Sequence, residues 1–232
     1  MLGIIGAMEE EVSRLTAAME EVRIVKRASM EFYQGKLSRK EAVVVRSGIG
    51  KVNAGICAQI LADLFSVDRI VNTGIAGSLD SAIDIGDIVL STDALQHDVD
   101  AAAFGYAPGV IPRMETSVFE ADSSMLQLAE SACRKVNPDI QVFTGRVVSG
   151  DQFIADKAKK DYLVSQFHPM CTEMEGGAIA QAACLNHIPF LIIRAISDKA
   201  DNSAQVDYPA FEAAAIEHSV RLVMELAACL PD

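Results

Sequence analysis

Residues 190–198 read Phe-Leu-Ile-Ile-Arg-Ala-Ile-Ser-Asp, and this stretch decides the class of fold. It opens with a continuous apolar run, which is typical of a strand buried on both faces of a sheet. It closes on Arg194, Ser197 and Asp198, where an open α/β sheet binds its ligands. The stretch therefore predicts a central strand whose carboxyl end carries chemistry.

Similar short runs rich in Val and Ile recur along the chain and alternate with segments of helical period. The predicted strands are Leu2–Ile5, Ala42–Arg46, Arg69–Thr73, Asp87–Leu90, Gln141–Ser149 and Phe190–Ile196. The predicted helices are Glu9–Met19, Asn53–Phe65, Ser124–Lys135, Asp156–Gln166, Met174–Asn186 and Tyr208–Ala228, with Pro209 at the start of the last one. The alternation predicts an α/β fold with a central mixed, largely parallel sheet flanked by helices. No linker interrupts it, so we expect a single domain over residues 1–232.

Composition narrows the possible partners of the chain. Half of its 232 residues are hydrophobic and 22% are charged, so we expect a buried core. A net charge of −12 repels phosphate backbones and argues against nucleic acid as a partner. No apolar run approaches the roughly 20 residues that span a bilayer, so we expect no membrane protein. The N-terminus has three glutamates in place of a basic signal region, and we expect the protein to stay in the cytoplasm.

The turn Gly48-Ile49-Gly50-Lys51 invites comparison with phosphate-binding loops. A nucleoside-triphosphate loop needs an earlier glycine and a Ser or Thr after the lysine, but Val45 and Val52 stand there. The third glycine of a dinucleotide fingerprint is also missing. We interpret the segment as a turn between a strand and a helix, at a place where ligand contact stays open.

The segment from Asp93 to Asp122 is the least regular of the chain. A loop of this length in a compact domain is usually functional or an interface. It contains His97, Asp98 and Asp100, but in an extended segment their spacing divides them between two faces. The five cysteines are scattered without close pairs. We therefore expect neither a metal ion nor a cofactor.

Three acidic sites remain, and we interpret all three as lying at strand ends. Glu9, Glu10 and Glu11 begin a helix, where the helix dipole alone would favour negative charge. The second site, Glu173-Met174-Glu175, precedes a helix of small residues that can pack closely on a sheet. Asp198 ends the last strand. Any one of them could be a solvated cap, but three such sites with an arginine among them indicate an active site.

These residues belong to segments that resemble the bacterial 5′-methylthioadenosine/S-adenosylhomocysteine nucleosidases, within the purine nucleoside phosphorylase superfamily. The matching segments are Gly3-Ile4-Ile5-Gly6-Ala7-Met8-Glu9-Glu10-Glu11, Ser47-Gly48-Ile49-Gly50-Lys51-Val52, Asn72-Thr73-Gly74-Ile75-Ala76-Gly77, Ala103-Phe104-Gly105-Tyr106, Ser149-Gly150-Asp151-Gln152-Phe153-Ile154, Glu173-Met174-Glu175 and Arg194-Ala195-Ile196-Ser197-Asp198. The resemblance implies a nucleoside phosphorylase-like fold. It also implies hydrolysis of the N-glycosidic bond of 5′-methylthioadenosine, S-adenosylhomocysteine and 5′-deoxyadenosine in methionine salvage.

The resemblance implies a role for each acid. Glu11 would be the general base that activates water. Glu175 would bind the ribose hydroxyls and stabilise the developing cation. Asp198 would protonate purine N7, so that adenine leaves neutral, and this role requires a raised pKa.

The resemblance also implies a substrate-binding set. Its members are Met8, Ile49, Ala76, Gly77, Phe153, Ile154, Glu173, Met174, Arg194 and Ser197. Phe104, Tyr106 and Pro112 match positions that a neighbouring subunit contributes, which implies a homodimer with shared active sites. Ile75 stands where the resemblance to the best-known members leads us to expect serine, and Ala101 where it leads us to expect valine. Both departures bear on substrate preference.

Three alternatives remain. A purine nucleoside phosphorylase would have to bind a phosphate dianion beside Glu9, Glu10 and Glu11, at a cost of roughly one kcal/mol per uncompensated contact. An aminofutalosine nucleosidase would use the same acids. A nucleoside-binding protein without turnover would lack one of the three acids, and all three are present.

Overall fold

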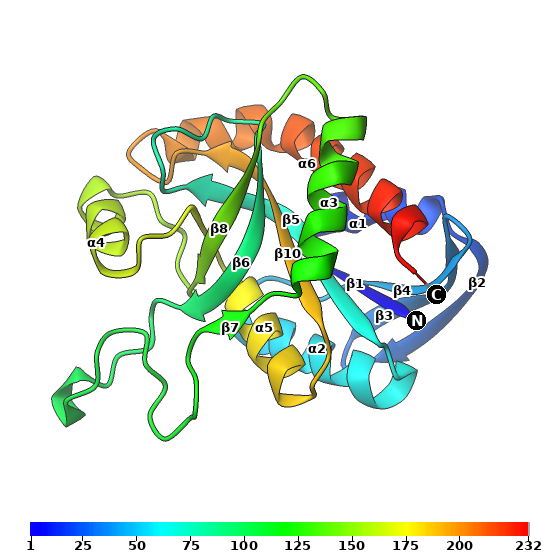
Figure 1. The fold of residues 1–232 in the computed structure, drawn as a ribbon, viewed down its shortest axis with the longest axis horizontal. Helices are drawn as coiled ribbons and strands as arrows, with labels where there is room; N and C mark the ends of the chain where they lie inside the picture. The colour runs from blue at the N-terminus through cyan, green and yellow to red at the C-terminus, as the bar shows by residue number, and fades with distance from the viewer. Residues whose placement is uncertain (232) are drawn as a thin grey trace.

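The computed structural model describes residues 1–231, so Asp232, the last residue of the expected domain, lies outside them. One mixed sheet runs through these residues (Figure 1). Its strands are β1 (Leu2–Gly6), β2 (Glu20–Arg27), β3 (Met30–Leu37), β4 (Lys40–Arg46), β5 (Arg69–Ser78), β6 (Ile88–Gln96), β7 (Phe119–Glu120), β8 (Val142–Ser149), β9 (Cys171–Glu173) and β10 (Phe190–Asp198). The strand order is β10-β6-β8-β9-β5-β1-β4-β3-β2, with β7 on β6 and a further pairing of β10 with β5. That pairing closes β5, β9, β8, β6 and β10 into a ring.

The predicted central strand is confirmed. β10 lies between β5, to which it is parallel, and β6, to which it is antiparallel. All of its residues are buried, as its apolar run requires. A bulge between Ile196 and Asp198 brings Asp198 opposite Gly77 of β5. Because β1 is also parallel to β5, the carboxyl ends of these three strands meet at one edge.

Helices cover both faces of the sheet, so the predicted α/β class is confirmed. They are α1 (Glu9–Ala17), α2 (Lys51–Phe65), α3 (Ser123–Val136), α4 (Lys157–Phe167), α5 (Gly176–Leu185) and α6 (Ala204–Cys229). One core packs α1, α3 and α6 against the sheet, and a second packs α2 and α5 against its other face. Figure 1 shows α3 beside α6, and α4 apart at one end. No helix within residues 1–231 combines the length and apolar character needed to cross a bilayer.

The hairpin of β2 and β3 was not predicted from the sequence. β2 has the sequence EEVRIVKR and is almost wholly exposed, so it lacks the apolar period that marks a strand. β3 alternates buried and partly exposed residues and pairs with both β2 and β4. The short strand β9 also escaped prediction, because three residues are too few to show a period.

The expected start of the last helix was wrong. α6 begins at Ala204, and Pro209 lies inside the helix. Asp201 and Ser203 explain the earlier start, because the Asp201 carboxylate accepts the backbone N–H of Ser203 at 2.9 Å and so shapes the turn that enters the helix. The sequence predicts a later start, because proline is favoured at the first position of a helix and Pro209 would mark that position.

Candidate active site

A cavity of about 230 Å³ opens at the shared edge of β1, β5 and β10. Four carboxyl groups face it together with a mainly apolar wall. Its lining residues are Ala7, Met8, Glu11, Ile49, Ile75, Ala76, Gly77, Gln152, Phe153, Ile154, Thr172, Glu173, Met174, Glu175, Ser197, Asp198 and Tyr208. Segments from nearly the whole length of the chain therefore meet at this one place.

Glu11 is held rigidly by backbone donors. Its Oε2 accepts the N–H groups of Ala7 and Met8 at 2.7 and 3.0 Å, and its Oε1 accepts the N–H of Ile75 at 3.2 Å. Burial raises the pKa of the Glu11 carboxyl, while Arg194 and these N–H groups oppose the rise. A fixed carboxylate with raised basicity is suited to take a proton from water. Glu9 and Glu10 are exposed and do not line this cavity.

Ile75, at the position where we expect serine from the resemblance, keeps one contribution that does not depend on its side chain. Its backbone N–H still holds Glu11. Its side chain is buried at the cavity wall and replaces a hydroxyl with an apolar surface.

Asp198 is the second acid. Its Oδ1 accepts the N–H of Ala200 at 2.8 Å, and its Oδ2 accepts the hydroxyl of Ser197 at 2.9 Å. Burial raises the pKa of the Asp198 carboxyl, and these two donors oppose the rise. A carboxyl whose proton is retained in this way is suited to donate it. Gly77 is required beside it, because a Cβ there would lie 2.7 Å from Oδ1.

Glu173 and Glu175 are both buried at the start of α5, yet their pKa values are shifted in opposite directions. Glu173 accepts hydrogen bonds from Arg194, Ser149 and the N–H groups of Glu175 and Gly176. Burial alone would raise the pKa of Glu173, but Arg194 and these donors outweigh it and hold that pKa below its usual range. Glu173 is therefore a structural anion that holds the start of the helix.

Burial and the neighbouring charge of Glu173 raise the pKa of Glu175 to about 8. The Glu175 side chain accepts one hydrogen bond, from the N–H of Gly50 at 2.8 Å. Its other oxygen has no hydrogen bond among the described contacts, and Glu175 lines the cavity. Of the two glutamates, Glu175 is the one placed to accept a hydroxyl from a ligand.

Arg194 lies behind the cavity, not in its wall. It is fully buried and donates to Glu173, to the backbone of Ile193 and to the side chain of Asn72. Its guanidinium group is therefore already engaged in bonds within the protein. The expectation that Arg194 contacts substrate directly stays a prediction. In the structure, Arg194 supports Glu173, which lines the cavity.

The apolar wall contains one aromatic pair. The rings of Phe153 and Tyr208 meet edge to face, with centroids 5.8 Å apart. Tyr208 donates to Glu212 at 3.1 Å and lies 3.4 Å from Sδ of Met8. Tyr208, Ala7, Gln152 and Thr172 were missed as lining residues; Gln152 sits in a segment that carried the resemblance, whereas Tyr208 has no local signal.

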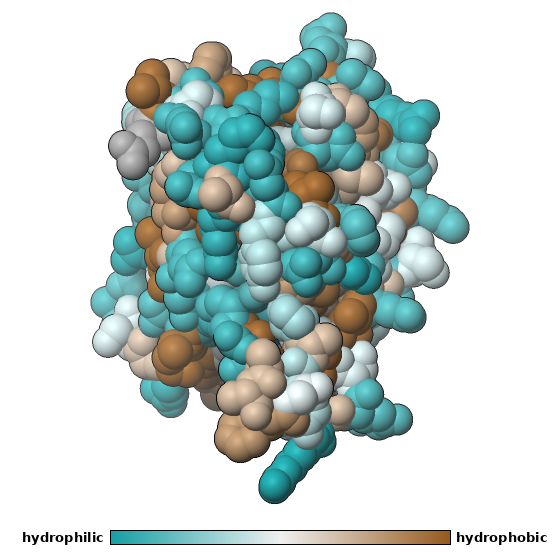
Figure 2. Space-filling view, turned by 90° about the vertical axis from the view of Figure 1, so that its left-hand side faces the viewer, coloured by the Kyte–Doolittle hydropathy of each residue, from teal (hydrophilic) through white to brown (hydrophobic). Residues whose placement is uncertain are grey.

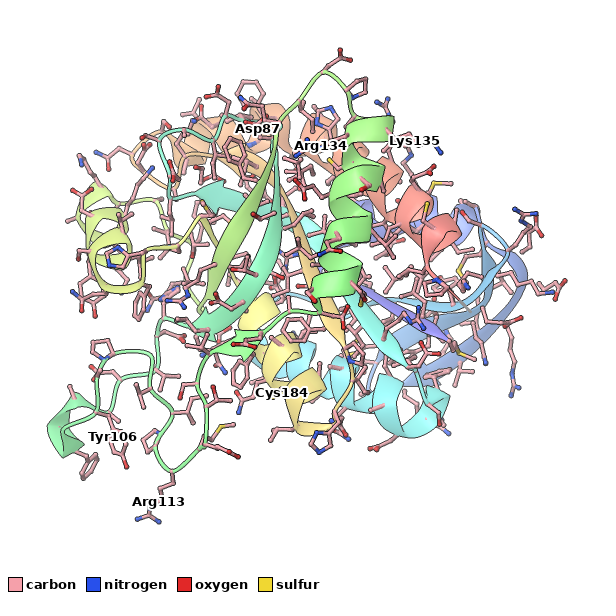
Figure 3. All side chains as sticks on the ribbon, viewed as in Figure 1. Asp87, Tyr106, Arg113, Arg134, Lys135 and Cys184 are labelled. Atoms are coloured by element: carbon pink, nitrogen blue, oxygen red, sulfur yellow. The ribbon has the colours of Figure 1, made fainter. Side chains whose placement is uncertain are left out.

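Twelve of the expected site residues line this cavity. They are Met8, Glu11, Ile49, Ala76, Gly77, Phe153, Ile154, Glu173, Met174, Glu175, Ser197 and Asp198. Phe104, Tyr106 and Pro112 do not. They lie on the segment between β6 and β7, which projects from the body of the molecule (Figure 1); Figure 3 shows Tyr106 and Arg113 at its outer end.

Comparison with known proteins agrees with this geometry. The family profile described as the phosphorylase superfamily matches residues 1–228. The 5′-methylthioadenosine/S-adenosylhomocysteine nucleosidase of Staphylococcus haemolyticus is 41% identical over 227 residues, which cover 97% of this chain and 98% of that protein. The chain belongs to the 5′-methylthioadenosine/S-adenosylhomocysteine nucleosidase family.

Solved structures extend the likeness to three dimensions. The Neisseria meningitidis nucleosidase of this family, in complex with methylthio-immucillin-A, superposes with a TM-score of 0.94 and 36% identity over 99% of both chains. The futalosine hydrolase of Helicobacter pylori superposes with a TM-score of 0.93 and 30% identity over 99% of this chain and 97% of that one. The nucleosidase family fold thus also serves a futalosine hydrolase.

Proposed function

We propose that the protein hydrolyses the N-glycosidic bond of 5′-methylthioadenosine and S-adenosylhomocysteine, releasing adenine and the 5-thioribose product. The observation that carries this proposal is the set of carboxyl groups around one cavity, whose surroundings suit them to different tasks. Relatives of about 40% identity over nearly the whole chain bear this activity in their names. 5′-Deoxyadenosine, with the same adenine and ribose, is a third candidate substrate.

The reaction needs a proton removed and a proton supplied. Glu11 takes a proton from water, and the water oxygen bonds to C1′ as the C1′–N9 bond breaks. Asp198 gives its proton to N7, so the bonding electrons leave with a neutral adenine. Glu175, when ionised, accepts a ribose hydroxyl and stabilises the positive charge that develops on the sugar. Proton exchange with solvent then restores Glu11 and Asp198.

Water is favoured over phosphate as the nucleophile. Among the described residues, those lining the cavity include Glu11, Glu173, Glu175 and Asp198 but no lysine or arginine. Arg194, the cation nearest to them, is already paired with Glu173 at 2.5 Å. A phosphate dianion would meet this acidic lining without a free positive charge, which opposes the phosphorylase alternative.

A homodimer with shared sites is part of the proposal. The Phe104 side chain is 85% exposed, and Val52 and Ile56 expose apolar surface on α2. Figure 2 views the side of the molecule from which the segment of Phe104 projects. Apolar residues gather at the lower end of that side in Figure 2. A second subunit would cover this surface and receive Phe104, Tyr106 and Pro112 at the open side of its own cavity.

We also propose the cytoplasm and methionine salvage as the setting. The five cysteines, among them the buried Cys57 and the exposed Cys229, are all free thiols, which fits a reducing compartment. The names of the relatives carry the two thio-substituted substrates of that salvage reaction.

The test is adenine release from 5′-methylthioadenosine with and without phosphate. We expect adenine and free 5-methylthioribose at the same rate in both buffers. Glu11→Gln and Asp198→Asn should each lower kcat by at least about 100-fold, since each removes one proton-transfer group. Glu10→Gln is the matched control, because Glu10 is exposed on the same helix turn. A ribose 1-phosphate product would overturn hydrolysis in favour of phosphorolysis.

The futalosine hydrolase likeness defines a second arm of the same assay. Aminofutalosine shares adenine and ribose with the proposed substrates but carries a different 5′ group. We expect a higher kcat/KM for 5′-methylthioadenosine than for aminofutalosine, because the wall near the cavity mouth is apolar, with Ile49 and Phe153 exposed there. The reverse order would assign the protein to the alternative.

A further inference from the structure

Lys51 stands at the start of α2, in the turn that matches no phosphate-binding pattern, and its charge is used inside the protein. Its Nζ lies 2.6 Å from Oδ1 of Asp98 and 3.0 Å from Oε1 of Gln96. The Lys51 and Asp98 side chains are only 18% and 15% exposed. Solvent therefore screens this ion pair less than an exposed surface pair.

Asp151 forms two further hydrogen bonds, one with Lys51 and one with Asp98. Its Oδ1 accepts the backbone N–H of Lys51 at 2.8 Å, and its own N–H donates to Oδ2 of Asp98 at 3.0 Å. Burial alone would raise the pKa of Asp98, but these bonds to Lys51 and Asp151 outweigh it and keep Asp98 ionised. We call Lys51, Asp98 and Asp151 the loop clasp, because Lys51 directly follows the Gly48–Gly50 turn and the two aspartates lie in the loops after β6 and β8.

Two of the segments held by the clasp lead into the wall of the cavity, and the third leads into the projecting segment. Gly50, which precedes Lys51, gives Glu175 its hydrogen bond, and Ile49 lines the cavity. Phe153 lies two residues after Asp151. The projecting segment that carries Phe104 starts at the residues after Asp98.

Gly50 permits the close approach of this turn to the clasp. Its φ of 97° lies in the left-handed region, and a Cβ at this position would lie 3.1 Å from Oδ1 of Asp151. A side chain at this position would be strained and would crowd Asp151, so glycine is needed where the turn meets the clasp. Asp151 holds this turn through its hydrogen bond from the N–H of Lys51.

We propose that Lys51 is a positioning residue of the active site, which, through Asp98 and Asp151, fixes the Gly48–Gly50 turn against Glu175 and anchors the projecting segment. The inference rests on the proposed function for its kinetic consequences only. Lys51 lines no part of the cavity and acts on substrate through its neighbours.

The kinetic consequence follows from Glu175. The charged groups that face Glu175 are Glu173, Arg194 and Glu11, and none of them belongs to the clasp. The N–H of Gly50 favours ionised Glu175, so a displaced turn would raise the pKa of Glu175 further. More of the protein would then hold Glu175 in the protonated form, which is not suited to accept the ribose hydroxyl.

The experiment compares Lys51→Met, which keeps the aliphatic stem, with wild type. We expect kcat/KM for 5′-methylthioadenosine to fall about tenfold at pH 7 and by less at pH 9, where Glu175 ionises again. Asp98→Asn should give a similar loss, and the double variant no more than the larger single loss. Lys51→Arg should restore part of the activity because it keeps the charge. Lys36→Met, which breaks the exposed ion pair of Lys36 with Glu21, is the control and should leave kcat/KM unchanged.

Hydrogen exchange supplies a readout that does not depend on substrate. Backbone amides of residues 98–106 and 150–153 should exchange faster in Lys51→Met than in wild type. Unchanged exchange together with a wild-type pH profile would overturn the clasp. A wild-type protein that releases no adenine would overturn the proposed function instead, and the exchange comparison would still decide the clasp.

Discussion

Glu175 shows how one residue links the active site to stability. The folded protein keeps its proton up to a pKa of about 8, whereas an unfolded chain loses it near the ordinary value of 4.5. Between these values the folded state binds the extra proton, so the free energy of unfolding decreases as the pH rises. The slope from this group is at most about 1.4 kcal/mol per pH unit.

Glu175→Gln should therefore flatten the pH dependence of stability between pH 5 and pH 8. Glutamine cannot ionise, so the variant loses this contribution and becomes more stable relative to wild type as the pH rises. Urea unfolding at several pH values measures both proteins, with Glu10→Gln as the exposed control. Equal slopes in wild type and Glu175→Gln would contradict the raised pKa.

Gly77 offers a steric test of the position of Asp198. A Cβ at Gly77 would lie 2.7 Å from Oδ1 of Asp198 and 2.8 Å from the Cβ of Ala200. Gly77→Ala should destabilise the protein by about 1–3 kcal/mol and lower kcat at least tenfold, because the carboxyl must move. Thermal unfolding and adenine release measure the two effects.

The second substitution Ala200→Gly separates these two contacts. It removes one clash and suits the positive φ of 50° at this residue, so stability should return in the double variant while kcat stays low. Recovery of kcat together with stability would show that Asp198 had not been displaced.

At the scale of elements, Arg194 is the buried tie that joins β10 to β5 and β9. It donates to Asn72 of β5 and to Glu173 of β9, and Glu173 in turn holds the first N–H groups of α5. Arg194→Met should cost about 3–5 kcal/mol of unfolding free energy, because Glu173 would be left buried and unpaired. Adding Glu173→Gln should recover part of that loss. Urea unfolding of the two variants measures it, and an equal or larger loss in the double variant would contradict a charge-based cause.

Elements were predictable from sequence where burial imposed a period. The run Phe190–Ile196 is apolar because both faces of β10 are buried, and the strand was found within two residues of its end. β2 could not be found, since its exposed charges follow no period and its pairing with β3 alone defines it. β5 and β6 are longer than predicted because their additional residues pair with β9, β10 and β8, which are distant in sequence.

At the scale of the whole molecule, the site was predictable as a set of strand ends and not as a shape. Glu11 follows β1 and Asp198 ends β10, so the rule for ligands at carboxyl ends of strands places these two acids together. Glu175 follows β9, a strand too short to be predicted. Arg194 and Tyr208 show the limit of that reasoning. Only the packed structure reveals that the first is committed to Glu173 and that the second reaches Phe153 from α6.

Shared active sites predict that two inactive variants restore each other. Glu11→Gln disables the subunit that holds the cavity, and Phe104→Asp disables the wall that a subunit lends to its partner. A mixed dimer then contains one site with both defects and one site with neither, so an exchanged equimolar mixture should recover about a quarter of wild-type activity. Adenine release before and after subunit exchange measures it. A mixture no more active than the average of the two variants would contradict sharing.

The position of β10 in the sheet also constrains how the chain is made. The last strand to leave the ribosome is the one that lies between β5 and β6, both synthesised about a hundred residues earlier. Until Asp198 emerges, the nascent chain holds two open strand edges, and Glu11, among the first residues translated, has no partner acid across the cleft. Chains released before Phe190 should therefore aggregate through those edges, and chaperones should be engaged late in synthesis.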